Sequence, residues 1–405
     1  MNGEEGILSG LKVIDAASFI AGPASTTIMA DFGAQVIKIE PPTGDPFRSA
    51  LGGSRYPVGG LAHSWILDNR NKKGVVLNLK SEAGRDVLYR LVSDADVFVT
   101  NAPQYPRERL GIRYEDLKPL NERLIYASLS AYGETGPEAH RSGFDSTALW
   151  ARSGLMDLVK PSPDAAPARS LPGMGDHPTA ATLFGAIMMG LYQRERTGKG
   201  SMVSTSLMAN GVWSNGCWLQ AVLCGNPVKP RPAREDAEDA LINLYRTSDD
   251  YWLIVTFMNS LARWPEFTER AGAPELSRDP RFATAEARAE NTKALIGALD
   301  KLFARKDRQA WRELLNDMGI TYGEVQSIGD VPHDPQMLES GVLRKVEDPD
   351  VGAPLTVDSP VWMEGVEKTP VKPAPKLGEH TVEVLRNAGY DDADIDRLRE
   401  ADAIP

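Results

Sequence analysis

The sequence predicts an α/β protein that combines a doubly wound parallel sheet with a second, smaller domain. Short runs rich in β-branched residues alternate with helical segments as far as Ser206, which is typical of a parallel sheet with helices on both faces. The chain then becomes proline-rich and charged at 226–238, as expected of a linker. A length of 405 residues exceeds what one compact core usually accommodates, so two domains are expected.

The first predicted unit is a strand, a helix and a second strand. The strand at 11–15 (LKVID) leads through a loop into a helix at 23–32, and a strand at 35–40 (QVIKIE) follows. This spacing favours a right-handed parallel crossover. The pattern then repeats, with strands expected at 74–79, 96–100, 124–129 and 201–206 and helices at 81–92, 114–120 and 207–223.

The loops at the carboxyl ends of these strands are where ligands are expected, because α/β sheets bind ligands at that edge. They cover 16–22, 41–48, 101–109 and 130–145. The first of them lacks the G-x-G-x-x-G fingerprint, which argues against a dehydrogenase with a dinucleotide site.

The second domain is expected at 225–334, inserted into a first domain that comprises 1–224 and 335–405. It begins with a hairpin, for which strands at 242–246 and 252–255 are predicted. Helices are predicted at 260–271, 284–304 and 308–318, and the chain then returns toward the sheet, with a strand at 361–363 and helices at 381–388 and 391–400.

Composition excludes several classes of function. A net charge of −11 disfavours a nucleic-acid partner, which would need a basic surface. Cys217 and Cys224 are too few for a zinc site or a disulfide framework, and we expect buried thiols and no metal. Neither a signal peptide nor a membrane-spanning run is recognisable, which favours a cytoplasmic protein. The residues Trp150, Met208, Trp213 and Trp218 lie on apolar segments and are expected in the core.

One acidic residue stands out at the start of a long apolar segment. Asp176 follows a glycine-containing turn with Gly173 and Gly175, and His177 and Pro178 come next. Proline fits the first turn of a helix, so Asp176 is placed at or just before the helix N-cap, where an anion is favoured. It is either a simple capping residue or a nucleophilic carboxylate held ionised by the helix terminus. The stretch alone leaves both interpretations open.

Five segments of the chain resemble the class III CoA-transferases, typified by formyl-CoA:oxalate CoA-transferase and including carnitine CoA-transferase and 2-methylacyl-CoA racemases. They begin with GLKVIDAASFIAGPASTTIMADFGAQVIKIEPPTGD, followed by NKKGVVLNLKSEAGRDVLYRLVSDADVFVTN and RLGIRYEDLKPLNERLIYASLSAYGETGP. The last two are LFGAIMMGLYQRERTGKGSMVSTSL and LGEHTVEVLRNAGY. Together they extend over nearly the whole chain.

The resemblance implies a Rossmann-like large domain built from both chain ends, a small inserted domain, and an interlocked homodimer. It implies a CoA-transferase that moves CoA from an acyl-CoA to a carboxylic acid, with CoA as substrate and no other cofactor. In that family an aspartate, which aligns with Asp176, forms anhydride and CoA-thioester intermediates. Such intermediates need shielding from water, and Gly173 and Gly175 would leave room for a thioester.

The resemblance also implies which residues bind CoA. Asn71, Lys72 and Lys73 fall where the family contacts the nucleotide, Asn101 where it meets pantetheine, and Arg109 on the phosphate-binding motif. His177, beside the nucleophile, is expected to contribute to the substrate site. A solvated surface pair is the alternative for the two lysines, and an ordinary helix-end cation for Arg109.

This chain departs from the formyl-CoA enzyme at several site positions. Ile20 stands in place of a glutamine and Pro41 in place of an arginine, for which Arg48 is a possible substitute; Ser142 replaces a lysine. These differences, and the lack of a tetraglycine loop, argue against oxalate as the acceptor.

The alternative activity is that of a 2-methylacyl-CoA racemase, which needs two bases on opposite faces of one carbon. Phe144 occupies the position of the racemase histidine and cannot move a proton, which favours the transferase. His140 and His177 are near enough in sequence to leave a compensating base open. Asp145 is expected to be a structural hydrogen-bonding acid. A non-catalytic binding protein is disfavoured because Asp176 is intact.

Overall fold

The computed structural model describes residues 6–48, 61–257 and 260–405, and the chain divides into two compact units. The larger unit comprises 1–156, 169–226 and 340–405, so it draws on both ends of the chain. The smaller unit comprises 227–339 together with the short segment 157–168. The domain boundaries expected from the sequence had assigned that short segment to the first domain.

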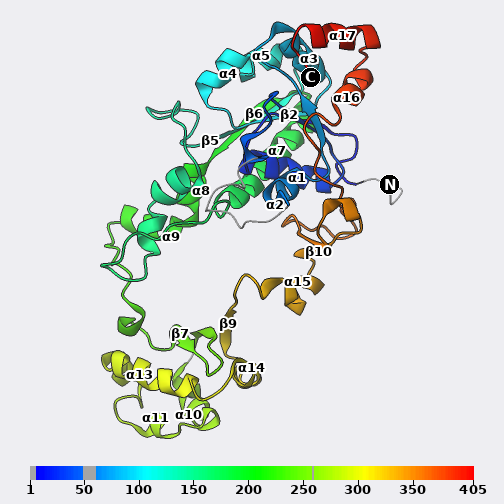
Figure 1. The fold of residues 1–405 in the computed structure, drawn as a ribbon. Helices are drawn as coiled ribbons and strands as arrows, with labels where there is room; N and C mark the ends of the chain where they lie inside the picture. Colours follow the sequence, from blue (N-terminus) through cyan, green and yellow to red (C-terminus); the bar gives the residue numbers. More distant parts are fainter. Residues whose placement is uncertain (1–5, 49–60, 258–259) are drawn as a thin grey trace. The chain divides into compact units, whose positions relative to one another are not determined.

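Six parallel strands form the sheet of the larger unit, in the order β3-β2-β1-β4-β5-β6. Figure 1 labels β2, β5 and β6 of this sheet. The order runs outward from β1 to β3 and then restarts on the other side with β4, as in the Rossmann fold. The strands are β1 (Lys12–Asp15), β2 (Gln35–Glu40), β3 (Lys73–Val76), β4 (Val97–Thr100), β5 (Ile125–Ser130) and β6 (Ser201–Ser206). The third strand ends earlier than predicted because the main chain and side chain of Asn78 form a turn before α3.

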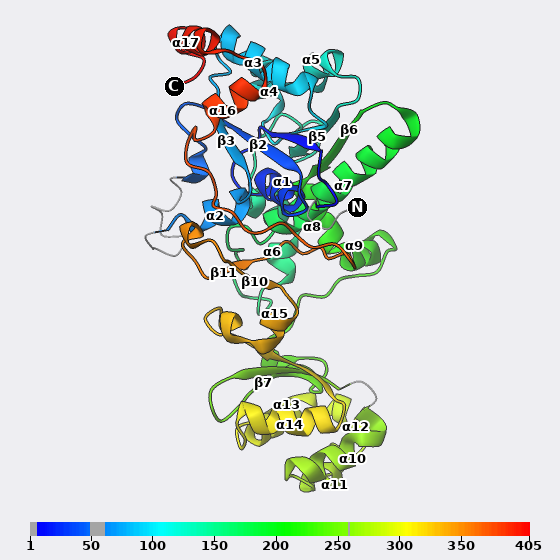
Figure 2. The same cartoon turned by 90° about the vertical axis from the view of Figure 1, so that its right-hand side faces the viewer.

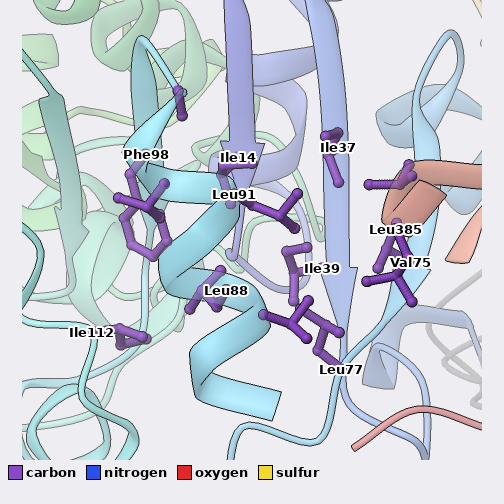
Figure 3. Close-up of a cluster of buried hydrophobic side chains, with 14 of the residues drawn as sticks. Ile14, Ile37, Ile39, Val75, Leu77, Leu88, Leu91, Phe98, Ile112 and Leu385 are labelled. Atoms are coloured by element: carbon purple, nitrogen blue, oxygen red, sulfur yellow. The ribbon is translucent and has the colours of Figure 1, made fainter. Parts of the chain in front are cut away.

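Helices cover both faces of this sheet because alternate residues of each strand point to opposite sides. On one side, α1 and α7 pack against a cluster that includes Val13 and Val36. On the other, Ile14 and Ile37 contact α3 and the C-terminal helix α16 (Figure 3), and α17 lies beside α3 (Figure 2). The bounds are α1 (Ala21–Asp31), α3 (Glu82–Ser93), α7 (Asp176–Thr197), α16 (Thr381–Asn387) and α17 (Asp392–Glu400).

Shorter elements complete the larger unit. Ser81 caps α3 as predicted, by accepting a hydrogen bond from the amide of Gly84. The predicted strand at 361–363 is reduced to one isolated bridge between Met363 and Val366. The remaining elements are α2 (His63–Asn69), α4 (Gln104–Leu110), α5 (Tyr114–Leu117), η4 (Asp145–Ala151), α8 (Leu207–Ser214), α9 (Gly216–Leu223), β10 (Leu343–Lys345) and β11 (Leu355–Val357). One further helix, α6 (Leu155–Leu158), includes the boundary at residues 156 and 157.

The tryptophan-rich segment after β6 differs from the prediction. It forms two helices, α8 and α9, which meet at Asn215, whose side-chain amide donates to the main-chain oxygen of Ser153. Trp213 is 86% exposed and Trp218 57% exposed, so their placement in the core was wrong. The predicted burial of the two cysteines, Cys217 and Cys224, was also wrong, since both are free and exposed. These helices are apolar all round, and only part of their surface packs. Trp150 and Met208 do pack against the core.

The smaller unit is an antiparallel sheet with helices packed around its core. The predicted hairpin is present, and a third strand pairs with its second strand. The long helix expected at 284–304 is broken at Asn291, which ends one helix and precedes the next. The elements are β7 (Ile242–Arg246), β8 (Trp252–Thr256), β9 (Thr321–Val325), α10 (Ser260–Ala271), α11 (Glu275–Arg278), α12 (Ala285–Glu290), α13 (Thr292–Phe303), α14 (Arg308–Asp317) and α15 (Pro335–Glu339). Across the described residues of the whole chain, no helix is long and apolar enough to cross a membrane.

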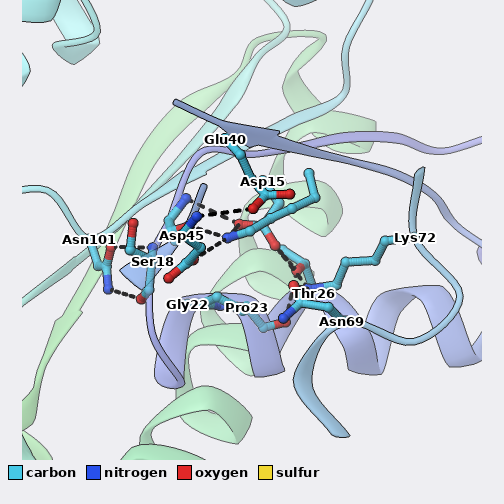
Figure 4. Close-up of polar contacts among 12 residues, drawn as sticks. Asp15, Ser18, Gly22, Pro23, Thr26, Glu40, Asp45, Asn69, Lys72 and Asn101 are labelled. Carbon is cyan, nitrogen blue, oxygen red and sulfur yellow. Dashed lines mark hydrogen bonds and ion pairs between the residues drawn. The ribbon is translucent and has the colours of Figure 1, made fainter. Parts of the chain in front are cut away.

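A buried ion network lies at the carboxyl ends of β1 and β2 (Figure 4). The fully buried carboxylate of Asp15 lies 2.9 Å from the ammonium nitrogen of Lys72 and 3.7 Å from that of Lys38. Lys38 also pairs with Asp45 at 3.1 Å and donates to the main-chain oxygen of Ala17. Burial alone would raise the pKa of Asp15, but the two lysines lower it overall. The network therefore joins the strand ends to the loop after β1.

Lys72 is integral to this network. Its ammonium nitrogen lies within 3.1 Å of four acceptors, which are the side-chain oxygens of Asp15 and Asn69 and the main-chain oxygens of Pro23 and Asp68. Burial lowers the pKa of Lys72 to about 8. Lys73, by contrast, is partly exposed and pairs with Glu383 at 2.8 Å.

We therefore expect the two neighbouring lysines to differ in their effect on stability. Lys72→Met should lower the free energy of unfolding by about 3–5 kcal/mol, because it leaves a carboxylate buried beside fewer cations. The matched control Lys73→Met should cost no more than about 1 kcal/mol, since its ion pair is solvent-accessible. Urea denaturation of the full chain measures both. Equal, small effects would contradict a structural role for Lys72.

Candidate active site

A cleft of about 350 Å³ lies within the larger unit at the carboxyl edge of its sheet. Its walls come from the loops that follow β1, β4 and β5, together with the first residue of α7, which is Asp176. The cleft adjoins the point where the strand order reverses, and ligands bind there in sheets of this kind. Most of the lining is apolar, and the polar or charged lining residues are Ser18, Asn101, Arg107, Ser130, Arg141, Ser142 and Asp176.

Asp176 is held at the mouth of α7 by contacts to the residues before it. Gly175 is the N-cap, and its amide donates to the buried carboxylate of Asp145 at 2.9 Å. Asp145 is thus the structural hydrogen-bonding acid that the sequence predicts. A Cβ on Gly175 would come within 2.7 Å of Leu149, so glycine is required there for packing. Asp176 is the first helical residue, one position beyond the N-cap expected for it.

The carboxyl group of Asp176 does not behave as a simple capping anion. Burial, and next the charge of Asp145, raise the pKa of Asp176 to about 7. The helix terminus was expected to keep the group ionised, but desolvation outweighs that effect. The half-buried carboxylate consequently carries less hydration than one in water, which favours its use as a nucleophile.

The next residue, His177, is fixed from two sides. Its Nε2 lies 3.0 Å from a carboxylate oxygen of Asp68, which is buried at the end of α2, and its Nδ1 lies 3.1 Å from the main-chain oxygen of Gly173. Gly173 has a φ of +90°, a conformation that favours glycine, and a Cβ there would lie 3.2 Å from the His177 ring. Gly173 therefore has a structural reason to be glycine. The room it was expected to leave for a thioester stays a prediction.

The loop after β1 forms the opposite wall and is held in an unusual conformation. Phe19 has a φ of +64°, which is uncommon for a residue with a side chain. The amide of Phe19 donates to Asp45, while Asn101 accepts from the amide of Ser18 and donates to the oxygen of Ser18 (Figure 4). Asn101 thus lines the cleft, while its side-chain amide and oxygen hold the loop; its contact with pantetheine stays a prediction.

Two aromatic rings face one another beside Asp176. Phe144 is 59% exposed, and its ring lies edge-on to that of Phe19 with 5.6 Å between centroids. Both line the cleft, whereas His140 lines a separate pocket beside α4 and α5. Although His140 is close to Phe144 in sequence, it does not line the cleft that contains Asp176.

The cations expected to bind CoA occupy different environments. Lys72 is buried in the ion network, which gives it a structural role in place of a nucleotide contact. Arg48 forms two hydrogen bonds to Glu40 and stacks on Trp65, with its guanidinium carbon 3.7 Å from the ring centroid. Lys73 and Arg109 remain accessible to solvent.

Asn71 also has a role within the fold. Its side chain donates to Asp31 and accepts from the amide of Lys372, so it ties the returning C-terminal chain to α1. Its φ of +65° is one that asparagine tolerates better than most residues.

Sequence reasoning missed three residues of this site. Arg107 lines the cleft and forms two hydrogen bonds to Glu134, at 3.0 and 3.1 Å. Its position in a strand-end loop of the predicted sheet could have identified it. Phe19 lies in such a loop too, but nothing local signals its conformation. Asp68 carries no sequence signal, because its partner His177 is 109 positions away.

A metal centre finds no support among the described residues, since no three His, Cys, Asp or Glu side chains gather closely enough to hold an ion.

Comparison with known proteins identifies the family. The model of CoA-transferase family III matches residues 8–381. The (R)-2-hydroxy-4-methylpentanoate CoA-transferase of Clostridioides difficile is 31% identical, over 98% of this chain and 99% of that protein. The acetyl-CoA:oxalate CoA-transferase of Acetobacter aceti is 34% identical, over 93% and 94% respectively.

A solved structure agrees with these matches. The crystal structure of a CAIB/BAIF family protein from Brucella suis superimposes with a TM-score of 0.85 at 29% sequence identity, over 95% of this chain and all of that one. It shares the α/β fold with its six-stranded parallel sheet. The chain therefore belongs to CoA-transferase family III and is an enzyme that transfers CoA between carboxylic acids.

Proposed function

We propose that Asp176 is the nucleophile of this CoA-transferase and carries CoA covalently between the two acids. The observation that supports it most is the position of Asp176, whose carboxyl lines the cleft at the carboxyl edge of the sheet. Its raised pKa of about 7 is that of a desolvated carboxylate, which attacks an acyl carbon more readily than a hydrated one.

The proposed reaction has four balanced steps. A carboxylate oxygen of Asp176 attacks the thioester carbon and the C–S bond breaks. CoA leaves as thiolate, and a mixed anhydride between Asp176 and the acyl group remains. The thiolate attacks the Asp176 carbonyl carbon and displaces the donor acid as carboxylate. The acceptor carboxylate then attacks the aspartyl thioester, releasing thiolate and forming a second anhydride. Finally the thiolate attacks the acceptor's acyl carbon, which gives the new acyl-CoA and restores the Asp176 carboxylate.

We expect the accessible cations to bind the phosphates of CoA and the cleft to hold its pantetheine end. Lys73 and Arg109 are exposed enough to meet phosphate oxygens, and Arg48 retains partial exposure. Asn101 and His177 border the path of the thioester, and Gly173 forms the turn next to it. Lys72 and Asn71 are proposed to support the site by stabilising the fold around it, without contacting CoA. CoA is the only cofactor-like molecule that this scheme requires.

A racemase activity is less well supported than the transferase. Racemisation needs two bases across one carbon, and Phe144 supplies none. His177, the histidine nearest to Asp176 in sequence, has both ring nitrogens next to hydrogen-bond acceptors.

Assembly of two copies as an interlocked homodimer remains part of the proposal. The surface of α8 and α9 exposes Trp213, Trp218 and Leu223, and apolar side chains of this size are usually covered. Sedimentation of the protein at assay concentration tests whether a dimer forms.

Replacement of the nucleophile should abolish exchange and spare binding. Self-exchange needs only one acid, so we would incubate an acyl-CoA with an isotopically labelled form of its own acid and follow label in the thioester by mass spectrometry. Asp176→Asn should lower the exchange rate by roughly 10³-fold or more. CoA affinity, measured by calorimetry, should change little.

The control is Asp157→Asn, which alters an exposed carboxyl paired with Lys160. It should exchange label at the wild-type rate. Surviving exchange in Asp176→Asn would remove that residue from the proposed mechanism. Loss of the α-proton of a 2-methylacyl-CoA to deuterated water, without label exchange for any acid, would favour the racemase.

The fall in exchange rate at low pH should reflect protonation of the Asp176 carboxyl. Its carboxyl must be ionised to attack, so kcat/KM for the acyl-CoA should fall about tenfold per pH unit below about 7. Asp145→Asn removes a negative charge that raises the pKa of Asp176, and it keeps an oxygen to accept from the Gly175 amide. This variant should therefore shift the acidic limb to lower pH. A limb that stays in place, or moves to higher pH, would contradict the assigned electrostatics.

A further inference from the structure

The surroundings of His177 determine its charge. Nε2 faces a carboxylate oxygen of Asp68 at 3.0 Å, and Nδ1 faces the main-chain oxygen of Gly173 at 3.1 Å. Neither oxygen can donate a hydrogen, so each short contact requires a proton on the ring nitrogen. A neutral imidazole has only one such proton. Both contacts are satisfied together only by the imidazolium.

The buried position of Asp68 supports the same conclusion. Its side chain is 2% exposed, and a buried carboxylate needs a cation or several donors. The nearby ammonium of Lys72 bonds to the main-chain oxygen of Asp68, which leaves the carboxylate to His177. Although partial burial opposes charging, the Asp68 hydrogen bond and charge raise the pKa of His177.

We infer that His177 is a positioning residue, charged at neutral pH, which holds the turn before Asp176 and supplies the positive charge that the nucleophile needs. This inference rests on the proposed role of Asp176. Two carboxylates face the site, Asp68 from α2 and Asp145 from η4, and both disfavour ionisation of Asp176. The imidazolium is the charge that opposes them.

The charge itself can be observed without any assay of activity. The chain has five histidines, so ring-nitrogen NMR of the full-length protein, with His177→Gln to assign the signal, is practicable. His177 should be doubly protonated at pH 7 in the wild type. Asp68→Asn should make it neutral at that pH, because the asparagine amide can donate to a bare Nε2 and the other contact survives. A neutral His177 ring at pH 7 in the wild type would overturn the inference.

Kinetics separate a charge effect from a purely structural one. His177→Gln removes the cation, so the acidic limb of kcat/KM should move up by about one pH unit or more. His177→Lys restores a cation within reach of Asp68 and should return the limb toward wild type. The exposed His63→Gln is the matched control and should leave the profile unchanged. If the acidic limb lies at the same pH in His177→Gln and His177→Lys, the charge of His177 has no effect on Asp176 and the inference is wrong. Label exchange would in that case still support Asp176 as nucleophile.

A second inference concerns the class of acid, and it rests on the walls of the cleft. Both arginines that line it are already paired: Arg107 with Glu134, and Arg141 with Glu138 at 2.8 Å. Among the described lining residues no buried cation is therefore free of a carboxylate partner, and a second carboxylate of the substrate would have to displace Glu134 from Arg107 or Glu138 from the half-exposed Arg141. In contrast, Phe19 and Phe144 expose large apolar surfaces beside Asp176.

We propose that the acids exchanged are monocarboxylates with an apolar or aromatic side group, which packs on Phe19 and Phe144. This deepens the proposed function by naming a substrate class. Self-exchange provides the test, with 4-methylpentanoate, 3-phenylpropanoate and glutarate each labelled and paired with its own CoA thioester. The two apolar acids should exchange at least about tenfold faster than glutarate, as expected for an unpaired buried carboxylate.

Phe144→Ala should remove most of that preference, because it slows exchange of the apolar acids. Phe144→Leu is the control that keeps a large apolar side chain at this position, and it should retain more of the preference. Faster exchange of glutarate than of both apolar acids would overturn the assignment of substrate class and leave the Asp176 mechanism intact. Absence of exchange for all three acids would count against the proposed function itself and against this assignment with it.

Discussion

The carboxylate of Asp15 lies fully buried at the end of β1, between the ammonium groups of Lys38 and Lys72. Each charge is tolerable there only because the others are present, since an isolated ion in this interior would be costly. The group joins the last residue of β1 and a residue of β2 to Lys72, which immediately precedes β3. It also fixes the loop after β1, because Lys38 binds the main-chain oxygen of Ala17 and pairs with Asp45, which in turn accepts from the amide of Phe19.

Hydrogen bonds also link the same network to the turn before Asp176. Lys72 bonds to the main-chain oxygen of Asp68, and the carboxylate of Asp68 bonds to the ring of His177. His177 in turn holds Gly173, next to the cap of α7. Both walls of the cleft therefore depend on the ion network, one through Phe19 and one through Asp176. A residue expected to bind nucleotide thus contributes to the site by supporting its framework.

The sequence predicts the sheet well because its strands are short, apolar and bounded by turn residues, and the six strands fall close to their expected positions. The local pattern of glycines, acid and proline also draws attention to Asp176, which lines the cleft and whose role as nucleophile stays a proposal. Prediction from the sequence fails where long-range contacts decide. Neither the burial of Lys72 nor the pairing of Asp68 with His177 has a local signal, and the exposure of Trp213 depends on which face of α8 finds a partner.

The central claim is that Asp176 carries CoA as a covalent thioester. Its most direct test is to incubate the protein with an acyl-CoA in the absence of acceptor acid, add hydroxylamine, and search the peptides by mass spectrometry. Hydroxylamine should convert an aspartyl thioester or anhydride at Asp176 to a hydroxamate, and that modification should appear only after exposure to acyl-CoA. An unmodified Asp176 in protein that still exchanges label between an acid and its thioester would contradict this account.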